Sequence, residues 1–386
     1  MPSVLRNSIR DLAPPFLRLG LTAFGGPAAH IAMMEEEFVR RREWISREEF
    51  LDMLGASNLV PGPSSTEMAI HIGHRRSGWR GLVVAGVCFI LPAMLIVMGC
   101  AWGYAKFGSM PRVQSVMYGV KPVIIAVILQ ALWGLARTAV KSGFLAIIGT
   151  VAAVLAIVGG NLLAILLAAG VVATLHALIT RRVASGSLSV IPSATKSILV
   201  STPAVGAAAS ASLSGLFLVF LKFGAVIFGS GYVLLAFLQT DLVDRLHWLN
   251  QTQLLDAVAV GQVTPGPVFT TATFIGYLLG GVGGAVVATV GIFLPGFLFV
   301  AASRPLIPRL RRSQVAGAFL DGVNVGAVAL MIAVTWQLGR AAVVDLLTAG
   351  IGLVSAFVLI RFRLNSAWLV LAGGCAGLVA SGWLST

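Results

Sequence analysis

A Pro-Gly-Pro triplet interrupts an apolar stretch of this chain at Pro61–Pro63, and the same triplet returns in a second apolar stretch at Pro265–Pro267. Each proline removes a backbone donor and biases the preceding residue away from helical angles, and the glycine allows a turn, so no regular helix runs through either triplet. In lipid, such broken backbone has to be buried in protein or line a polar cavity. The residues after each break then open a half-helix whose N–H groups and positive dipole end suit an anion.

The composition indicates that these stretches do lie in lipid. The 386 residues are 58% apolar and 11% charged, with a mean hydropathy of +0.94, whereas about a quarter of the residues in soluble domains are charged. Uncharged runs such as 81–104 and 142–180 are long enough for helices that cross a hydrocarbon core of about 30 Å, and no alternating pattern suggests a barrel. The first fifteen residues have no apolar core, so they do not form a cleavable signal peptide. We predict an all-α polytopic membrane protein.

The remaining composition excludes several classes of function. The net charge of +13 is interpreted as Lys and Arg that face cytoplasm and lipid headgroups, not nucleic acid. Cys88, Cys100 and Cys375 are isolated in apolar segments, and His71 and His74 lack a third ligand nearby, so no metal or redox site is predicted. The sequence has no phosphate-binding loop and no dinucleotide fingerprint, which argues against energy from bound ATP.

The two triplets belong to an internal duplication. At an offset of 204 residues the following residues coincide with residues of the same type: Phe16, Gly20, Phe24, Gly25, Trp44, Asp52, Pro61, Gly62, Pro63 and Thr66. At an offset of 203 the register continues through Pro92, Gly119, Trp133 and Arg137. A register held over some 130 residues predicts two repeats. The predicted domains are a first repeat at 1–180, a cytoplasmic linker at 181–213 and a second repeat at 214–386.

Basic loops indicate how the repeats are oriented. Arginines follow the first apolar segment within 40–47 and the second within 75–80, so both loops favour the cytoplasm, and the segment between them is predicted to enter and leave on one side. In the second repeat the corresponding loop at 277–284 is uncharged, and arginines gather in the next loop, at 304–312. We therefore predict two repeats of inverted topology, each with about five crossing helices and a broken re-entrant hairpin.

Four charged residues in apolar segments are candidates for function. Arg18 and Lys222 hold equivalent positions; an anionic ligand would explain Lys222, whereas Arg18 is also close enough to a helix end to reach the headgroups. Lys121 either contacts the substrate or pairs with an acid such as Glu67 or Asp321. Glu67 follows the first break directly, and it either carries a proton or coupling ion or only caps the half-helix.

The predicted substrate site combines these cations with the broken backbone. Its residues are Arg18, Gly25, Gly26, Pro61, Gly62, Pro63, Ser64, Ser65, Thr66, Lys121, Lys222, Gly266, Thr270 and Thr271, and Glu67 is the predicted ion-coupling residue. The repeat also matches Asp52 with Asp256, which are either functional or ordinary first-turn acids.

The motifs Phe16–Gly20, Phe24–Pro27, Pro61–Pro63 and Phe89–Pro92, with their second copies, resemble the bacterial chromate transporter family in its two-domain form. The resemblance covers nearly the whole chain outside the linker and the first fifteen residues. It implies efflux of chromate across the inner membrane, driven by ion gradients, and it places the family's basic residue at Arg18. The second copy departs from the pattern with Lys222 for arginine and Gly231 for proline.

The residues themselves do not distinguish among similar anions. Chromate and sulfate are tetrahedral dianions of nearly equal size, and helix N-termini, hydroxyls and cations bind either. A sulfate-type oxyanion permease is therefore the alternative function, and a membrane enzyme that reduces chromate would need a flavin, haem or thiol site, which the sequence does not indicate. We expect a transporter without a cofactor, with chromate or sulfate as substrate, in contact with the lipid bilayer. The sequence leaves open whether the chain forms a homodimer.

Overall fold

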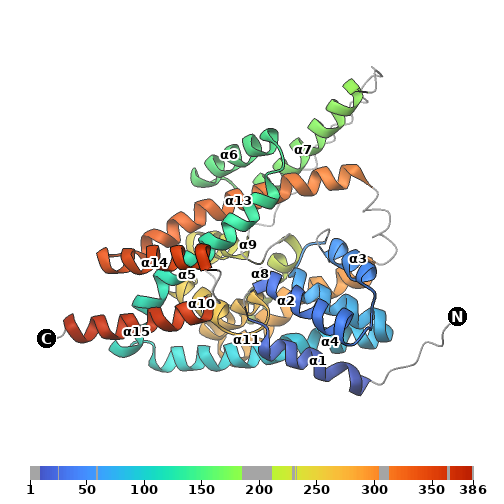
Figure 1. The fold of residues 1–386 in the computed structure, drawn as a ribbon. Coiled ribbons are helices and arrows are strands. Elements are labelled where there is room, and N and C mark those ends of the chain that lie inside the picture. The colour runs from blue at the N-terminus through green and yellow to red at the C-terminus, as the bar shows by residue number, and fades with distance from the viewer. Residues whose placement is uncertain are drawn as a thin grey trace.

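The computed structural model describes residues 9–24, 26–57, 60–184, 211–227, 231, 233–303, 313–362 and 366–384, and all regular elements within these ranges are helices (Figure 1). The first repeat contains α1 (Ile9–Thr22), α2 (Gly26–Glu35), η1 (Glu36–Arg41), α3 (Arg47–Ser57), α4 (Ser64–Phe107), α5 (Pro111–Ala139), α6 (Gly143–Ile157) and α7 (Leu162–Ala184). The second contains α8 (Leu213–Val226), α9 (Val233–Phe237), η2 (Leu238–Arg245), α10 (Gln251–Val263), η3 (Val268–Thr270), α11 (Thr271–Ser303), α13 (Gln314–Ala342), α14 (Leu346–Phe362) and α15 (Ser366–Leu384). The all-α prediction is confirmed. Most of the predicted linker lies outside the described residues.

The length and hydropathy of the helices fit a membrane protein. Within the described residues, α4, α5, α7, α13 and η3 with α11 give five stretches long and apolar enough to cross a membrane, and α6, α8, α14 and α15 are shorter apolar helices. Large apolar side chains such as Trp336 and Leu346 are exposed on these helices, as expected where lipid covers them. The exact number of crossings in each repeat stays a prediction.

The first apolar segment of each repeat turns back on itself. The rings of Phe16 in α1 and Phe38 in η1 stack with centroids 4.8 Å apart, whereas a straight helix would separate these residues by about 33 Å. In the second repeat, Lys222 of α8 reaches Asp241 of η2 at 2.5 Å. The interruption predicted at Phe24–Pro27 is therefore a reversal of the chain. Pro27 falls in the first turn of α2, where a missing N–H is tolerated.

The predicted re-entrant hairpin is confirmed by contacts between its two ends. Glu49 at the start of α3 and Arg75 near the end of the next limb lie 2.9 Å apart, so the two limbs return to the same side of the break between them. Non-helical angles at Ser77 and Gly78 then separate residues 64–76 from the rest of α4. Close contact between Gly73 and Gly81 folds this limb back against the crossing helix. The second repeat has the same kink, at Gly280 and Gly281.

The relation between the repeats is visible in their equivalent long helices, α5 and α13. Tyr118 near the start of α5 donates a hydrogen bond to Asp345 just beyond the end of α13. Lys141 just beyond the end of α5 contacts Asp321 near the start of α13 at 2.6 Å. The two helices are thus antiparallel neighbours, as inverted repeats require and as parallel repeats would not produce.

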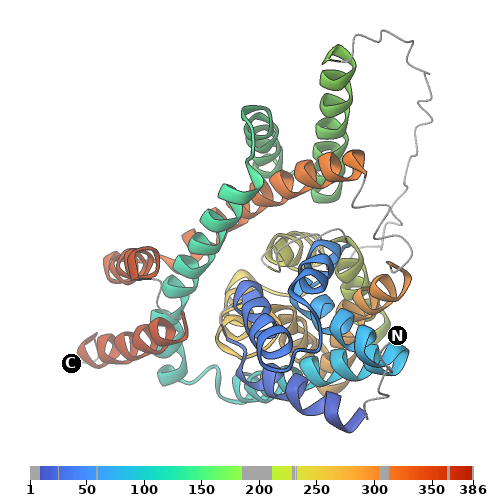
Figure 2. The same ribbon diagram turned by 45° about the vertical axis from the view of Figure 1, so that its right-hand side comes forward.

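The outer helices pack on the opposite repeat. Helices α6 and α7 contact α13, whereas α14 and α15 contact α5. The contact between α5 and α15 depends on small residues, since Gly119 meets Gly373 and Gly377 backbone to backbone. Figure 2 shows these six helices as an arm beside a bundle formed mainly by α1–α4 and α8–α11. The broken helices lie in that bundle.

Candidate functional site

The two Pro-Gly-Pro breaks contact each other's repeats. The amide of Gly62 donates a hydrogen bond to the carbonyl of Ile227, which follows α8, at 2.7 Å. The amide of Gly266 donates to the carbonyl of Ala23, which follows α1, at 2.8 Å. These are the same contact made twice, because Gly62 and Ala23 are equivalent in the repeat to Gly266 and Ile227. Each break is therefore joined to the residue at which the first helix region of the other repeat ends.

The glycine of each break is required by backbone angles and by close packing. Gly62 has φ of +139° and Gly266 has φ of +90°, a region that residues with a side chain rarely adopt. A Cβ on Gly62 would lie 2.3 Å from Oε1 of Glu67. A Cβ on Gly266 would lie 2.5 Å from Cβ of Ala93. The breaks are therefore tightly packed.

The first half-helix carries buried polar atoms without partners. Ser64, Ser65 and Thr66 are buried, and Glu67 is fully buried at 0% exposure. The hydroxyl of Thr66 and both carboxylate oxygens of Glu67 have no hydrogen-bond partner within the described residues. The Glu67 side chain lies against Gly62 and against Gly296 of α11. Buried polar groups are almost always paired, so such a cluster indicates a place where a proton, water or ligand binds.

The second half-helix begins with the 3-10 turn η3 before α11, and its threonine hydroxyls are satisfied. Thr270 Oγ1 donates to the carbonyl of Pro267 at 2.7 Å, and Thr271 Oγ1 donates to the carbonyl of Val268 at 2.8 Å. Its first positions are the apolar Val268 and Phe269 instead of serines. This half-helix is accordingly less able to offer side-chain donors to a ligand.

The predicted cations lie at different distances from this centre. Arg18 is exposed on α1 and makes no ion pair within the described residues. Lys222 is half-buried and is bound to Asp241 at 2.5 Å. Gly26 is buried and begins α2, while Gly25 lies outside the described residues. The sequence associated Arg18 with the half-helix of its own repeat, whereas the backbone contact of α1 is with the break of the other repeat.

Lys121 takes part in a buried group that joins the two repeats. Its Nζ lies 3.1 Å from Oδ1 of Asp256 in α10, and Tyr104 at the end of α4 donates to Oδ2 of the same carboxylate at 2.7 Å. The prediction that an acid such as Glu67 or Asp321 would pair with Lys121 named the wrong acids: Asp321 binds Lys141 instead.

Asp256 and Tyr104 are neighbours of Lys121 that sequence reasoning did not place together. Asp256 is 3% exposed in the middle of α10, so it is no ordinary first-turn acid. The sequence did contain a sign of this burial, because Asp256 stands inside the apolar run Leu254–Val260, where a charged side chain needs a partner.

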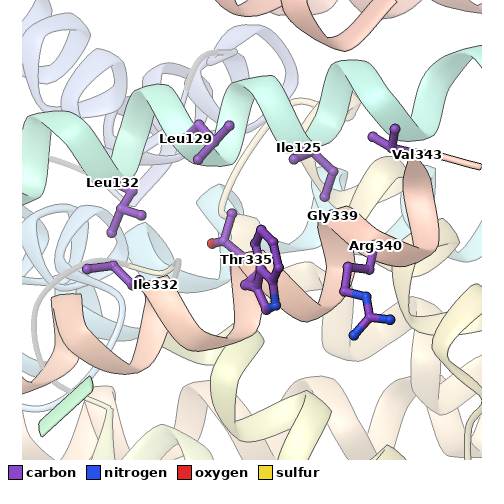
Figure 3. A pocket seen from close by; sticks show the side chains of 9 residues that line it. Ile125, Leu129, Leu132, Ile332, Thr335, Gly339, Arg340 and Val343 are labelled. Atoms are coloured by element: carbon purple, nitrogen blue, oxygen red, sulfur yellow. The ribbon is translucent and has the colours of Figure 1, made fainter. Parts of the chain in front are cut away.

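A separate cavity of about 580 Å³ lies between α5 and α13 (Figure 3). Its lining is Ile125, Leu129, Leu132, Ile332, Thr335, Trp336, Gly339, Arg340 and Val343. One hydroxyl and one cation among apolar side chains do not offset the cost of removing a dianion from water, so this cavity does not suit an oxyanion.

Comparison with known proteins gives a consistent result over both repeats. A family described as "Chromate transporter" matches residues 10–174 and again residues 214–378. The chain is 34% identical over 382 residues to a protein named "Chromate transport protein" from Cupriavidus metallidurans, covering 97% of this chain and 93% of the relative. It is 32% identical over 404 residues to a protein of the same name from Pseudomonas aeruginosa, covering 97% and 96%. No solved structure matches the chain significantly.

Proposed function

This chain belongs to the chromate transporter family, and from that premise we propose that it is a secondary transporter that exports chromate across the bacterial inner membrane and so gives resistance to chromate. Membership in a family of multi-pass membrane transporters agrees with the prediction that the protein is not an enzyme. Chromate as substrate is supported by the names of relatives that are similar over more than nine tenths of this chain.

We place the chromate site where the two breaks contact the ends of the first helix regions of the opposite repeats. The observation that carries this proposal is the crossed pair of hydrogen bonds, Gly62 to Ile227 and Gly266 to Ala23, which holds broken backbone from both repeats together. Broken helices of transporters line substrate sites, and their N-termini stabilise anions. The first half-helix adds the buried hydroxyls of its three residues before Glu67.

Arg18 is the cation that we assign to this site. It belongs to α1, the helix whose Gly20 carbonyl lies beside the second break, since a Cβ on Gly266 would be 3.2 Å from that oxygen; Arg18 itself is exposed and lies on the face of α1 away from Gly20. Because Arg18 has no acidic partner within the described residues, its charge is available to a dianion. Lys222 is its equivalent in the second repeat, and there Asp241 competes with any anion for the ammonium group.

Glu67 is the group that we assign to coupling. A carboxylate that is fully buried and has no partner within the described residues is costly as an anion. It is stable when it holds a proton or a cation, and exchange of that ion between the two sides would connect export to an ion gradient.

The test is uptake of labelled chromate into everted membrane vesicles, with sulfate and molybdate as competitors. Chromate should accumulate in vesicles that contain the protein, and a tenfold excess of sulfate should reduce uptake only partly. Equal competition by sulfate would favour the general oxyanion permease, and absence of chromate uptake would refute chromate transport.

Variants of the two equivalent cations test the site. Arg18→Ala should abolish uptake and Arg18→Lys should keep part of it, because charge remains while two-pronged hydrogen bonding is lost. Lys222→Ala is the matched control and should have the smaller effect, since Lys222 is already occupied by Asp241. Uptake at the wild-type rate by Arg18→Ala, at equal membrane levels of protein, would place the site elsewhere.

A further inference from the structure

His71 is a second buried ionisable group on the same limb as Glu67. It follows Glu67 by four residues in the helical stretch 64–76, so the two side chains stand on one face, a single turn apart. His71 is buried, and its Nε2 has no hydrogen-bond partner within the described residues. The limb therefore carries two buried groups without partners on one helical face, and the first of them lies next to the first break.

The elements packed around this limb offer few other charged groups. Helix α11 contains no charged side chain between Thr271 and Ser303. On α3, Glu49 is bound to Arg75 and lies near Asp52, at the mouth of the hairpin.

The remaining ionisable groups nearby have contacts of their own. His30 of α2 contacts the carbonyl of Ala23 through Nε2, while its Nδ1 has no partner within the described residues, and Asp256 of α10 is bound to Lys121. On the limb itself, His74 packs edge-on against Trp79, and Arg76 lies over the ring of Trp44. Arg18 on α1 is exposed. Glu67 and His71 are therefore the buried ionisable groups of this limb whose side-chain atoms are left without partners.

We propose that Glu67 and His71 form a proton-binding pair that couples chromate movement to the proton gradient; this inference rests on the proposed function. No hydrogen bond joins the two groups directly, so one proton serves both by residing on Nε2 of His71 or on a carboxylate oxygen of Glu67 and passing between them by way of water. When it moves from Nε2 to the carboxylate, the imidazolium becomes neutral imidazole and the carboxylate becomes a neutral acid, so the net charge of the pair is unchanged. Loss of the proton to water leaves the pair with one negative charge.

The surroundings favour a proton over a metal cation. Hard cations are held by several oxygen ligands, whereas Glu67 is faced by the backbone of Gly62 and Gly296. The second group of the pair offers a ring nitrogen, which hard cations do not prefer. A proton needs only the two groups that are present.

The pair exists once per chain. The matching stretch of the second repeat has Thr270 and Thr271, whose hydroxyls are bonded to Pro267 and Val268, and, two residues before Gly276 where His71 precedes Gly73, the buried Phe274. The duplication therefore supplies two breaks but one proton site.

The test measures chromate transport as a function of pH in proteoliposomes that contain the purified full chain. Glu67→Gln should give a rate that no longer changes with pH. His71→Gln should keep a measurable rate and move the midpoint of the pH profile by about one unit or more, because the acid loses the group that shares its proton. His74→Gln, one turn beyond His71, is the matched control and should keep the wild-type profile.

A second measurement does not depend on transport. The infrared carbonyl band of a protonated carboxylic acid should be present in the purified wild-type protein, absent in Glu67→Gln and shifted in its pH dependence in His71→Gln. A wild-type band and pH profile in His71→Gln would overturn the pair. A rate that requires sodium and is insensitive to pH would overturn the choice of a proton. If the wild-type protein carries chromate and either of these two outcomes is found, the proposed function stands and only the pair is wrong.

Discussion

The two breaks of this protein have the same shape and different chemistry. Both place a glycine with positive φ between two prolines, and both donate one hydrogen bond to the first helix region of the other repeat. The first break is followed by serines, an unpaired threonine hydroxyl and the buried Glu67, whereas the second is followed by apolar residues and threonines that are already bonded. The comparison teaches that the repeat preserves the geometry of broken backbone while buried polar atoms without partners, among the described residues of the two half-helices, lie in one copy.

The largest effect is expected where the repeats differ most, at the buried ion pair between Lys121 and Asp256. The residues equivalent to these two are Asn324 and Asp52, so the second copy of the pair has lost its cation. Lys121→Met should lower the free energy of unfolding by about 3–5 kcal/mol, because it leaves a buried carboxylate without a counter-charge.

Thermal unfolding of the purified protein in detergent measures this effect. Lys121→Met with Asp256→Asn should recover most of the lost stability, and Asn324→Met is the matched control, with little change expected. If Lys121→Met unfolds at the wild-type temperature, the pair contributes nothing and the asymmetry between the repeats has no energetic meaning.

The next effect tests the part that the two breaks share. Gly62→Ala and Gly266→Ala should each cost about 2–4 kcal/mol, from left-handed backbone strain and overpacking together. Because both glycines are equally constrained, chromate uptake should fall at least tenfold in either variant. Gly78→Ala is the control for overpacking. Its φ of +60° gives the same kind of backbone strain, whereas a Cβ at this position meets nothing within 4 Å. A tolerated Gly266→Ala would show that only the first break needs its shape.

Much of this architecture was predictable from the sequence because it depends on local rules. Proline and glycine determine where the helices break, and the register between the copies identifies equivalent residues. The residues of the other repeat that each break contacts were not predictable, because an internal repeat identifies equivalent residues but does not identify neighbours in space. Thus the sequence identified Gly62 and Gly266 as equivalent residues. It did not predict that they donate hydrogen bonds to Ile227 and Ala23.

The charged partners show the same limit. Lys121 was recognised as a cation that either contacts the substrate or pairs with an acid such as Glu67 or Asp321, and its pairing with Asp256 depends on how α5 and α10 pack. His71 was noticed only as half of a weak metal motif. Its significance depends on burial and on the lack of a partner for Nε2, which no spacing in the sequence reveals.

A smaller effect separates the two hydroxyls that begin the half-helices. Thr270→Val should cost about 1 kcal/mol, because the hydrogen bond to Pro267 is lost. Thr66→Val should leave stability unchanged or raise it, since its hydroxyl has no partner within the described residues. Chromate uptake should respond in the opposite order, with the larger loss in Thr66→Val. Equal losses of uptake would mean that the two half-helices contact the substrate equally.

The smallest effect concerns the mouths of the two hairpins. Both mouths begin with a capping box, Ser46 with Glu49 in α3 and Asn250 with Gln253 in α10. Within the described residues only the first adds an ion pair, because Glu49 also binds Arg75 while the residue equivalent to Arg75 is Leu278. The hydrogen bond from Arg75 holds the pKa of Glu49 below its ordinary value of 4.5. Since this pKa is lowered in the folded state, the stabilisation is present above pH 4.5 and is lost as the pH falls below that value.

Hydrogen exchange of the two capped helices measures this difference, with α10 as the internal reference for α3. Between neutral pH and about pH 3, protection of α3 should fall relative to α10. The change should correspond to less than about 1 kcal/mol, because both side chains of the ion pair are partly exposed and solvent screens them. Arg75→Leu, which copies the second repeat, should lower α3 protection at neutral pH and remove its additional loss on acidification. If α3 and α10 lose protection in parallel in the wild-type protein, the ion pair does not hold the first hairpin closed, and the two mouths are equivalent in energy as well as in shape.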